Sequence, residues 1–371
     1  MIRWLIVITS VLSLYSQCFA TPSVTGLAGT LTSGSAITVT GTGFGTHADY
    51  NAGDANKLNF IWHTFEDGNL TSAEVIQASP TGYWIVESST GRTNSAYWAR
   101  RVNVNGTIEV PVDDNTHGLR SATVESPGTY FISMWFKTIS GSEAYKFFRC
   151  SDIAAINEPD FFASTGGFTG GDTPDMRIRF STECTVLGDP PCPQSTNYDS
   201  DINMPSDETW VRVDIYLDGP NNLQDCYVVG LNNNEDVWPV DLYMSGPMNS
   251  SFIANIGAGM KGRGEAEIPN NYYGLDDIFI DFTAARVEIC TAADGTWASR
   301  SVCEIQIPTT WSDTAVTFTV NRGAYAVDGS AYLFVIDSDN SADPTGYPIT
   351  FGSSYNVEAI SGCSFTGGTL Q

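Results

Sequence analysis

The sequence is poor in basic residues. Only 17 of its 371 residues are lysine or arginine, against 42 aspartates and glutamates, and the formal net charge is −25. Proteins that bind nucleic acids or anionic membranes neutralise phosphates with a basic surface. The shortage of positive charge therefore disfavours both kinds of partner. Such acidity is typical of an extracellular protein with a solvated surface.

Histidine is scarce as well. The sequence also lacks sustained helical patterns, and it lacks long hydrophobic segments after the N-terminus. With three histidines, the chain offers no convincing Ser-His-Asp order. Its glycine-rich stretch, Gly166–Gly171, follows no strand–helix pattern and so does not match a phosphate-binding loop. No segment after the N-terminus is apolar enough to span a bilayer, so we expect no membrane insertion.

The first twenty residues have the pattern of a secretory signal. Arg3 supplies positive charge, Trp4–Leu14 is apolar, and Cys18 and Ala20 are the small residues before a cleavage site. The apolar run is too short for a membrane anchor. We therefore expect residues 1–20 to be removed and the protein to be secreted or held at the cell surface.

Seven of the eight cysteines follow this segment, and in an exported protein we expect them to pair. The spacing suggests a bridge across a turn-rich loop, a bridge at the base of a hairpin, and a bridge between strands of the central region. These pairs are Cys184–Cys192, Cys290–Cys303 and Cys150–Cys226. Cys363 is then left over, as a free thiol, as an intermolecular link, or as a sign that the pairing differs.

Alternating apolar and polar residues recur along the chain, with turn-forming clusters between them. This period of two is typical of half-buried strands, and no helical stripe lasts longer than a turn or two. The pattern predicts an all-β protein. The alternating runs are 36–40, 130–136, 176–180, 210–217, 277–281, 316–320 and 332–336.

The segment Ala36–Gly45, AITVTGTGFG, resembles the IPT/TIG family of immunoglobulin-like domains, in which a strand ends in a Gly-x-Gly-Phe-Gly turn. The later strands of that family resemble Trp311–Val320 and Ala331–Ile336. The resemblance implies an immunoglobulin-like sandwich that is cut in two, made of residues 21–46 and 285–352. The alternative is that the two segments are unrelated and pack separately on the region between them. Residues 353–371 are expected to form a C-terminal tail, or a final edge strand.

The region between the halves, residues 47–284, resembles a concanavalin A/laminin-G-like jelly roll. The resemblance implies a larger jelly-roll β-sandwich inserted into the smaller one. Such folds bind glycans, proteins or Ca²⁺, and some are glycoside hydrolases or polysaccharide lyases. The segments that carry it are Phe60–Gly68, Thr129–Thr138, Glu208–Asp218 and Tyr272–Asp281.

Catalytic patterns are weak in this region. A glycoside hydrolase needs two carboxylates across a cleft, and the Glu-x-Asp-x-x-Glu strand common in jelly-roll hydrolases is missing. A lyase needs a base beside cations that neutralise a uronate. The residues that fit are His63, His117 and Tyr97, with Arg92, Arg100, Arg101 and Arg120 nearby in sequence. Pairing with carboxylates is the simpler interpretation of these arginines.

Aromatic residues near turn-rich segments suggest a ligand-binding surface, because exposed rings stack on sugars. By contrast, Trp62, Trp135 and Trp210 lie inside strand patterns and are expected in the core. The candidate ligand-binding residues, with two of the arginines, are Trp84, Trp98, Arg100, Arg120, Trp238 and Tyr243.

Acidic clusters suggest Ca²⁺ as a possible cofactor, because oxygen-rich loops hold this ion. The candidate metal ligands are Asp199, Asp201 and Asp207. A second cluster, Asp337–Asn340, stands where a hairpin turn is expected, and turn chemistry accounts for it.

Together these patterns predict an exported, non-catalytic binding protein. The expected partner is an extracellular polysaccharide or a cell-surface protein, bound through the jelly roll. Two alternatives stay open: a polysaccharide lyase or glycoside hydrolase, and a self-assembling structural subunit of an extracellular surface.

Overall fold

The structure is a computed structural model, and within the residues it describes the elements are antiparallel strands and one 3-10 turn, η4 (Trp297–Ser299). The all-β class is therefore confirmed. Among these residues, no helix is long and apolar enough to cross a membrane. The described residues are 21–47, 60–71, 75–77, 84–88, 91–101, 119–121, 129–138, 145–152, 159–165, 177–181, 197–203, 209–218, 223–229, 234–239, 252–260 and 273–355.

The first of three sheets contains residues from both ends of the chain, and we call it the split sheet. Its strands, in spatial order, are β22 (Tyr347–Thr350), β21 (Ser330–Ile336), β18 (Arg286–Ala292), β19 (Arg300–Ser312), β20 (Ala315–Thr319), β2 (Ala36–Thr42), β1 (Ser23–Thr30) and β23 (Ser354–Tyr355).

The N-terminal and C-terminal segments share one core in this sheet. Strand β2 pairs with β20, and Val39 lies opposite Val316. The side chains of Ile37, Val39, Val316 and Phe318 are fully buried in one apolar cluster. The expectation that residues 36–40 and 316–320 belong together is confirmed. The immunoglobulin-like assignment stays a prediction.

The Gly-x-Gly-Phe-Gly turn closes one end of this core. Phe44 is fully buried, and its backbone oxygen accepts a hydrogen bond from Nε1 of Trp311 at 3.2 Å. A Cβ atom on Gly41 would lie 2.0 Å from the backbone oxygen of Ser23 and 2.5 Å from the Phe44 ring. Glycine is therefore required at position 41 because the neighbouring backbone and ring leave no room.

The central region forms two further sheets. The middle sheet runs β15 (Asn234–Pro239), β14 (Leu223–Val229), β13 (Trp210–Asp218), β8 (Thr129–Thr138), β17 (Tyr273–Asp281), β6 (Trp98–Arg101) and β5 (Trp84–Glu87), with β3 (Phe60–His63) also paired to β17. The far sheet runs β12 (Asn197–Asn203), β11 (Arg177–Ser181), β10 (Pro159–Thr165), β9 (Tyr145–Asp152), β16 (Phe252–Met260), β7 (Leu119–Ser121) and β4 (Val75–Gln77).

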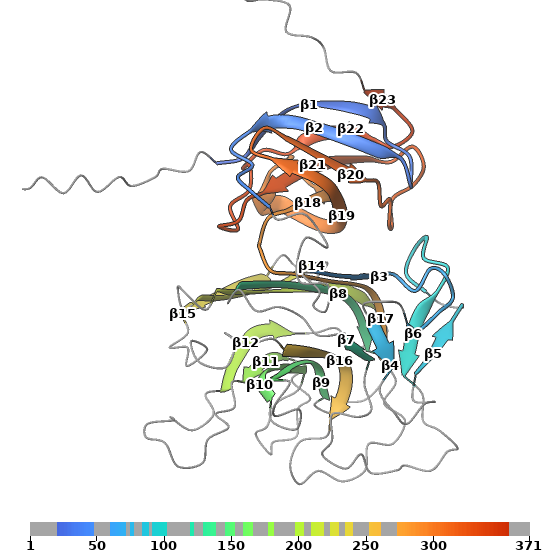
Figure 1. Cartoon of the computed structure of the whole chain (residues 1–371), viewed down its shortest axis with the longest axis vertical. Helices are drawn as coiled ribbons and strands as arrows, with labels where there is room; N and C mark the ends of the chain where they lie inside the picture. The colour runs from blue at the N-terminus through green and yellow to red at the C-terminus, as the bar shows by residue number, and fades with distance from the viewer. Residues whose placement is uncertain are drawn as a thin grey trace, which may run out of the picture.

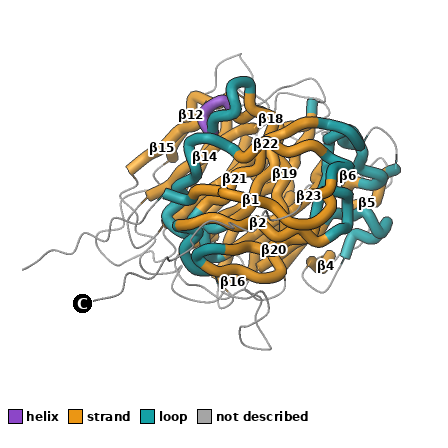
Figure 2. The backbone as a smooth tube through the Cα atoms, turned by 90° about the horizontal axis from the view of Figure 1, so that it is seen from above, coloured by secondary structure: helices purple, strands orange, loops and turns teal. Residues whose placement is uncertain are grey.

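The three sheets form successive layers. Figure 1 shows the split sheet at one end of the molecule, the middle sheet below it, and the far sheet on the opposite side. Seen from above in Figure 2, strands of the split sheet lie over the central region. The middle sheet therefore has a layer on each face, and its two faces differ in chemistry.

Candidate functional site

The most elaborate arrangement of charged side chains lies between the split and middle sheets. Strand β13 alternates Val211, Val213 and Ile215 with Arg212 and Asp214, and all five are buried. Successive residues of a strand point to opposite faces. One face of β13 is therefore apolar, while the other presents charged groups to the split sheet.

Arg212 is the centre of this arrangement. Its guanidinium donates hydrogen bonds to Asp214 at 2.5 Å, to Glu288 at 2.7 Å and to the backbone oxygen of Cys303 at 3.0 Å. Arg212 is 1% exposed and Glu288 is fully buried. A buried charge needs such partners because water is excluded from it. The guanidinium thus joins β13 of the middle sheet to β18 and β19 of the split sheet.

Arg286 extends the contact from the split sheet. Its Nε donates to Glu288 at 2.5 Å, and its Nη1 donates to the side-chain oxygen of Asn340 at 2.9 Å. The guanidinium also lies 3.9 Å from the ring centroid of Phe131 on β8, a cation–π contact. Burial alone would raise the pKa of Glu288, but Arg212 and Arg286 outweigh it and lower that pKa to about 2.

A second cluster surrounds Arg92. Its guanidinium donates to Asp277 and Glu304, its Nε lies 3.5 Å from Asp276, and it covers the ring of Trp135 at 4.6 Å. Burial raises the pKa of Asp277 to about 7 against the opposing effect of Arg92. Burial and the adjacent Asp277 also raise the pKa of Asp276. Burial therefore disfavours the charged form of Asp276 and Asp277, because water is excluded from both carboxyl groups.

Local backbone geometry brings the carboxylates of the Arg92 cluster together. The β17–β8 register skips between Asp276 and Phe279, as in a β-bulge, and Asp277 has a φ of 43°. This bulge places both aspartates beside Arg92. On the split side, a Cβ on Gly323 would lie 2.0 Å from the carboxyl carbon of Glu304, so only glycine leaves room for that carboxylate.

Apolar side chains complete the contact between the two sheets. Because they exclude water, the charged groups beside them interact more strongly than they would at a surface. This combination can hold two units in a fixed relative position, and the charged members described above are all buried. The apolar members are Phe131, Tyr216, Phe279, Ala284 and Ile305, with Trp62 and Ile307 partly buried.

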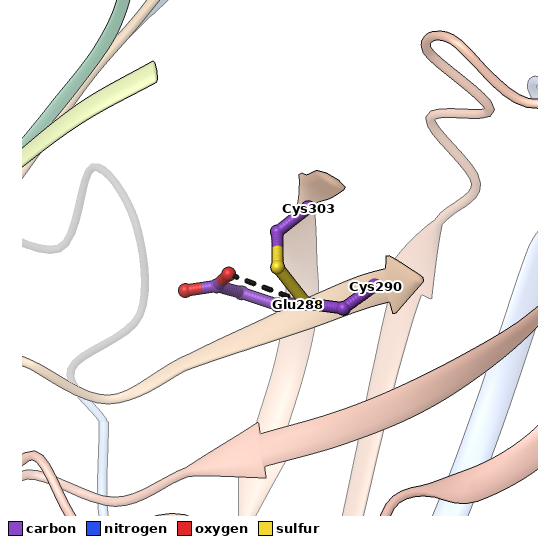
Figure 3. A group of neighbouring side chains, drawn as sticks. All are labelled: Glu288, Cys290 and Cys303. Carbon is purple, nitrogen blue, oxygen red and sulfur yellow. Dashed lines mark hydrogen bonds between the residues drawn. A yellow bond between two sulfur atoms is a disulfide. The ribbon is translucent and has the colours of Figure 1, made fainter. Parts of the chain in front are cut away.

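A metal site is excluded at one group of ligand-type residues that the described part of the chain brings together. Glu288, Cys290 and Cys303 lie close to one another. The two sulfurs form a disulfide between β18 and β19, however, as predicted from the hairpin spacing (Figure 3). Disulfide sulfurs offer no thiolate to a metal, and Glu288 is occupied by Arg212 and Arg286.

Removing this disulfide should lower stability. The bridge closes a loop with a sequence separation of 13, and such a loop contributes about 3 kcal/mol. The double variant Cys290→Ala/Cys303→Ala should lose about that much free energy of unfolding, measured by chemical denaturation. Cys363→Ala, which removes the cysteine left over from the predicted pairs, is the control. Equal stability of the double variant and the wild type would contradict the expectation.

Two of the predicted ligand-binding aromatics are buried. Trp84 on β5 is 2% exposed and Trp98 on β6 is 1% exposed. The Trp98 ring packs on Gly274, and Nζ of Lys137 lies 4.5 Å from its centroid. The expected exposed stacking platform is therefore wrong for these two residues, because their strands belong to the covered middle sheet. Trp135, by contrast, is buried as predicted.

Most other predicted site residues stay predictions. Arg100, Arg120, Trp238, Asp199 and Asp201 lie on β6, β7, β15 and β12, where the structure describes only their backbone. The remaining ones, together with the signal segment 1–20, lie outside the described residues: Tyr243, Asp207, Cys184, Cys192 and Cys363. The bridge Cys150–Cys226 is likewise untested, since only the backbones of β9 and β14 are described.

Two lyase candidates lie away from any open surface. His63 on β3 is 5% exposed and packs edge-on against Phe65. Arg92 is paired with carboxylates, which was the simpler interpretation of the sequence. Neither residue is placed to meet a polymer. The turn interpretation of the second acidic cluster is also confirmed, because Asp337 accepts hydrogen bonds from the backbone N–H groups of Asp339 and Ser341.

The sequence is matched by no family model and by no curated protein. Among solved structures it is similar to the alginate lyase of Aplysia kurodai, with a TM-score of 0.40, 7% identity, and coverage of 56% of this chain and 89% of the lyase. It is also similar to the β-glucanase of Bacillus licheniformis, with a TM-score of 0.35, 12% identity, and coverage of 60% of this chain and 98% of the glucanase.

A SAP-like pentraxin of Limulus polyphemus gives a TM-score of 0.29 and 12% identity, over 43% of this chain and 65% of the pentraxin. This chain thus spans slightly less than two thirds of the pentraxin. Similarity at these TM-scores assigns neither a family nor a function.

Proposed function

We propose that this chain is an exported binding protein whose larger, jelly-roll-like unit recognises extracellular polysaccharide. The split unit, which we propose is immunoglobulin-like, serves as its mount. The proposal combines the secretory pattern of residues 1–20 with the layered arrangement of the sheets. It makes the far sheet, rather than the interface, the place where a ligand binds.

The observation that carries the proposal is that the mount occupies the outer face of the middle sheet. Arg212 and Arg92 fix this contact through Glu288 and Glu304, all of which are buried. The far sheet keeps one face turned away from both other sheets (Figure 1). A face formed by a seven-stranded sheet suits an extended polymer better than a small molecule, which needs a concave pocket.

A polysaccharide array tests this function. The full-length secreted protein should be retained on at least one polysaccharide, and incubation should release no reducing or unsaturated ends. Release would contradict the non-catalytic proposal and favour a lyase or hydrolase. Absence of retention on every polysaccharide would contradict the proposal and favour a protein partner or self-assembly.

The same array tests the calcium prediction. If Asp199, Asp201 and Asp207 hold Ca²⁺ that supports the binding surface, EDTA should weaken retention and added Ca²⁺ should restore it. Retention that is equal with and without EDTA would contradict the prediction that Ca²⁺ supports binding.

A further inference from the structure

Residues of the far sheet form a polar row across three strands. Arg120 on β7 lies opposite Asn255 on β16, and Asn255 lies opposite Arg149 on β9. Directly opposed residues of antiparallel strands share one face of the sheet. These three residues therefore share a face, although they are far apart in the sequence.

The neighbouring row shows which face this is. Leu119, next to Arg120, is fully buried and lies opposite Ile256, which in turn lies opposite Phe148. Phe148 lies opposite Ala163. Because successive residues alternate between faces, the apolar row belongs to the face that packs inside the sandwich. The row with Arg120 and Arg149 is on the face turned away from the middle sheet.

Positive charge is concentrated on this outer face of a strongly acidic chain. Arg179 on β11 shares it, because Arg179 is two residues from Ser181, Ser181 lies opposite Phe162, and Phe162 lies opposite Arg149. Arg177, two residues from Arg179 on the same strand, shares the face by the same alternation, so four of the 17 basic residues stand on it.

Carboxylates are placed unevenly along this face. Asp199 lies directly opposite Arg179, and Asp201, two residues further along β12, shares the face. The residues in register with Arg120 and Arg149, however, are Ile76, Asn255 and Phe162, none of which is acidic. The two arginines around Asn255 are therefore the best-placed positive charges for an external anion.

We propose that this face binds an anionic polysaccharide, with Arg120 and Arg149 contacting its carboxylate or sulfate groups and Asn255 contacting its hydroxyl groups. This inference rests on the proposed function and adds the chemical class of the ligand. A guanidinium binds carboxylate and sulfate with paired hydrogen bonds. Arg120 and Arg149 lie two strands apart, about 10 Å, so a polymer with repeated charges can meet both.

The net charge of the chain strengthens the choice of face. At −25, most of the protein repels a polyanion, and an acidic ligand is directed to the place where arginines gather. A neutral polysaccharide would gain hydrogen bonds from this arrangement but no attraction between opposite charges.

The test measures binding of the full-length protein to polygalacturonate, dextran sulfate and a neutral β-glucan. At least one of the two anionic polymers should bind at least about tenfold more tightly than the glucan. Arg149→Gln and Arg120→Gln should each weaken that binding about tenfold, the effect of losing one charge-assisted hydrogen-bonding group. Lys57→Gln removes the same charge outside the described strands and should stay within about twofold of the wild type.

A salt series on the unmodified protein makes the test independent of variant folding. Binding to the anionic polymer should weaken steeply with added NaCl, because salt screens exposed charges. Preference for polygalacturonate or for dextran sulfate would identify carboxylate or sulfate as the recognised group. Equal binding of the neutral glucan, unaffected by salt and by both arginine variants, would overturn the inference and leave the proposed function standing. Binding to no polysaccharide would overturn both.

Discussion

Replacing Arg212 with methionine is expected to lower the free energy of unfolding by about 3–5 kcal/mol. Arg212 is 1% exposed and holds Asp214, Glu288 and the backbone oxygen of Cys303. Methionine fills a similar volume but donates no hydrogen bond. Two carboxylates would then be left buried with fewer partners, and this unpaired state is the source of the loss.

Chemical denaturation of Arg212→Met measures this effect. Asp328→Asn, which changes an exposed charge in a turn of the split unit, is the control and should stay within about 0.5 kcal/mol of the wild type. The replacement also weakens the contact between the two units, so the variant should become more sensitive to protease in the segments that join them. A loss below about 1 kcal/mol would show that Arg212 does not stabilise the interface.

The protein is expected to become less stable as the pH rises from about 4 to 7. The pKa of Asp277 is raised from 3.8 to about 7 in the folded state. Over this range the unfolded chain gives up the proton while the folded chain keeps it. The free energy of unfolding therefore falls, by at most about 1.4 kcal/mol per pH unit for this group.

Glu288 acts in the opposite direction at lower pH. Its folded pKa of about 2 lies below the ordinary 4.5, so its contribution to stability is present above pH 4.5 and is lost as the pH falls toward 2. The combined contribution of these two buried carboxylates, Asp277 and Glu288, to stability is therefore largest between about pH 4 and 5.

The variant Asp277→Asn separates the two effects. It should reduce the decline in stability between pH 5 and 7, because asparagine does not titrate, and it should leave the loss below pH 4.5 in place. Thermal unfolding across a pH series measures both, with Asp328→Asn as the variant that should keep the wild-type profile. A wild-type stability that rises from pH 5 to 7, or an unchanged slope in Asp277→Asn over that range, would contradict the role given to Asp277 in the Arg92 cluster.

Periodicity made the all-β class predictable, and a turn motif made the shared sheet predictable. Strands such as Ala36–Thr42 and Trp210–Asp218 show the alternation of a two-faced sheet directly. The turn that ends at Gly45 indicated an immunoglobulin-like sandwich. Residues 21–46 are too few to form all of its strands, so the remaining strands had to come from elsewhere in the chain. The hairpin spacing of Cys290 and Cys303 likewise predicted their disulfide, since both cysteines lie close in sequence.

The interface was not predictable from the same patterns. Alternation places Arg212 and Asp214 on the polar face of a strand, and such a face is ordinarily exposed to water. Here a second unit covers it, and the partners of Arg92 lie 185 and 212 positions further along the chain. Trp84 and Trp98 were misplaced for the same reason, because nearness to turns does not show that a sheet is covered on both faces.

Hydrogen–deuterium exchange with and without a polygalacturonate oligosaccharide is the sharpest test of ligand binding at the far sheet, because it reports which face of the molecule meets the ligand. Exchange should become slower in β7, β16 and β9, where Arg120, Asn255 and Arg149 lie, and should stay unchanged in the split sheet. Protection in the split sheet, or no protection in these three strands when the oligosaccharide is bound, would contradict ligand binding at the far sheet.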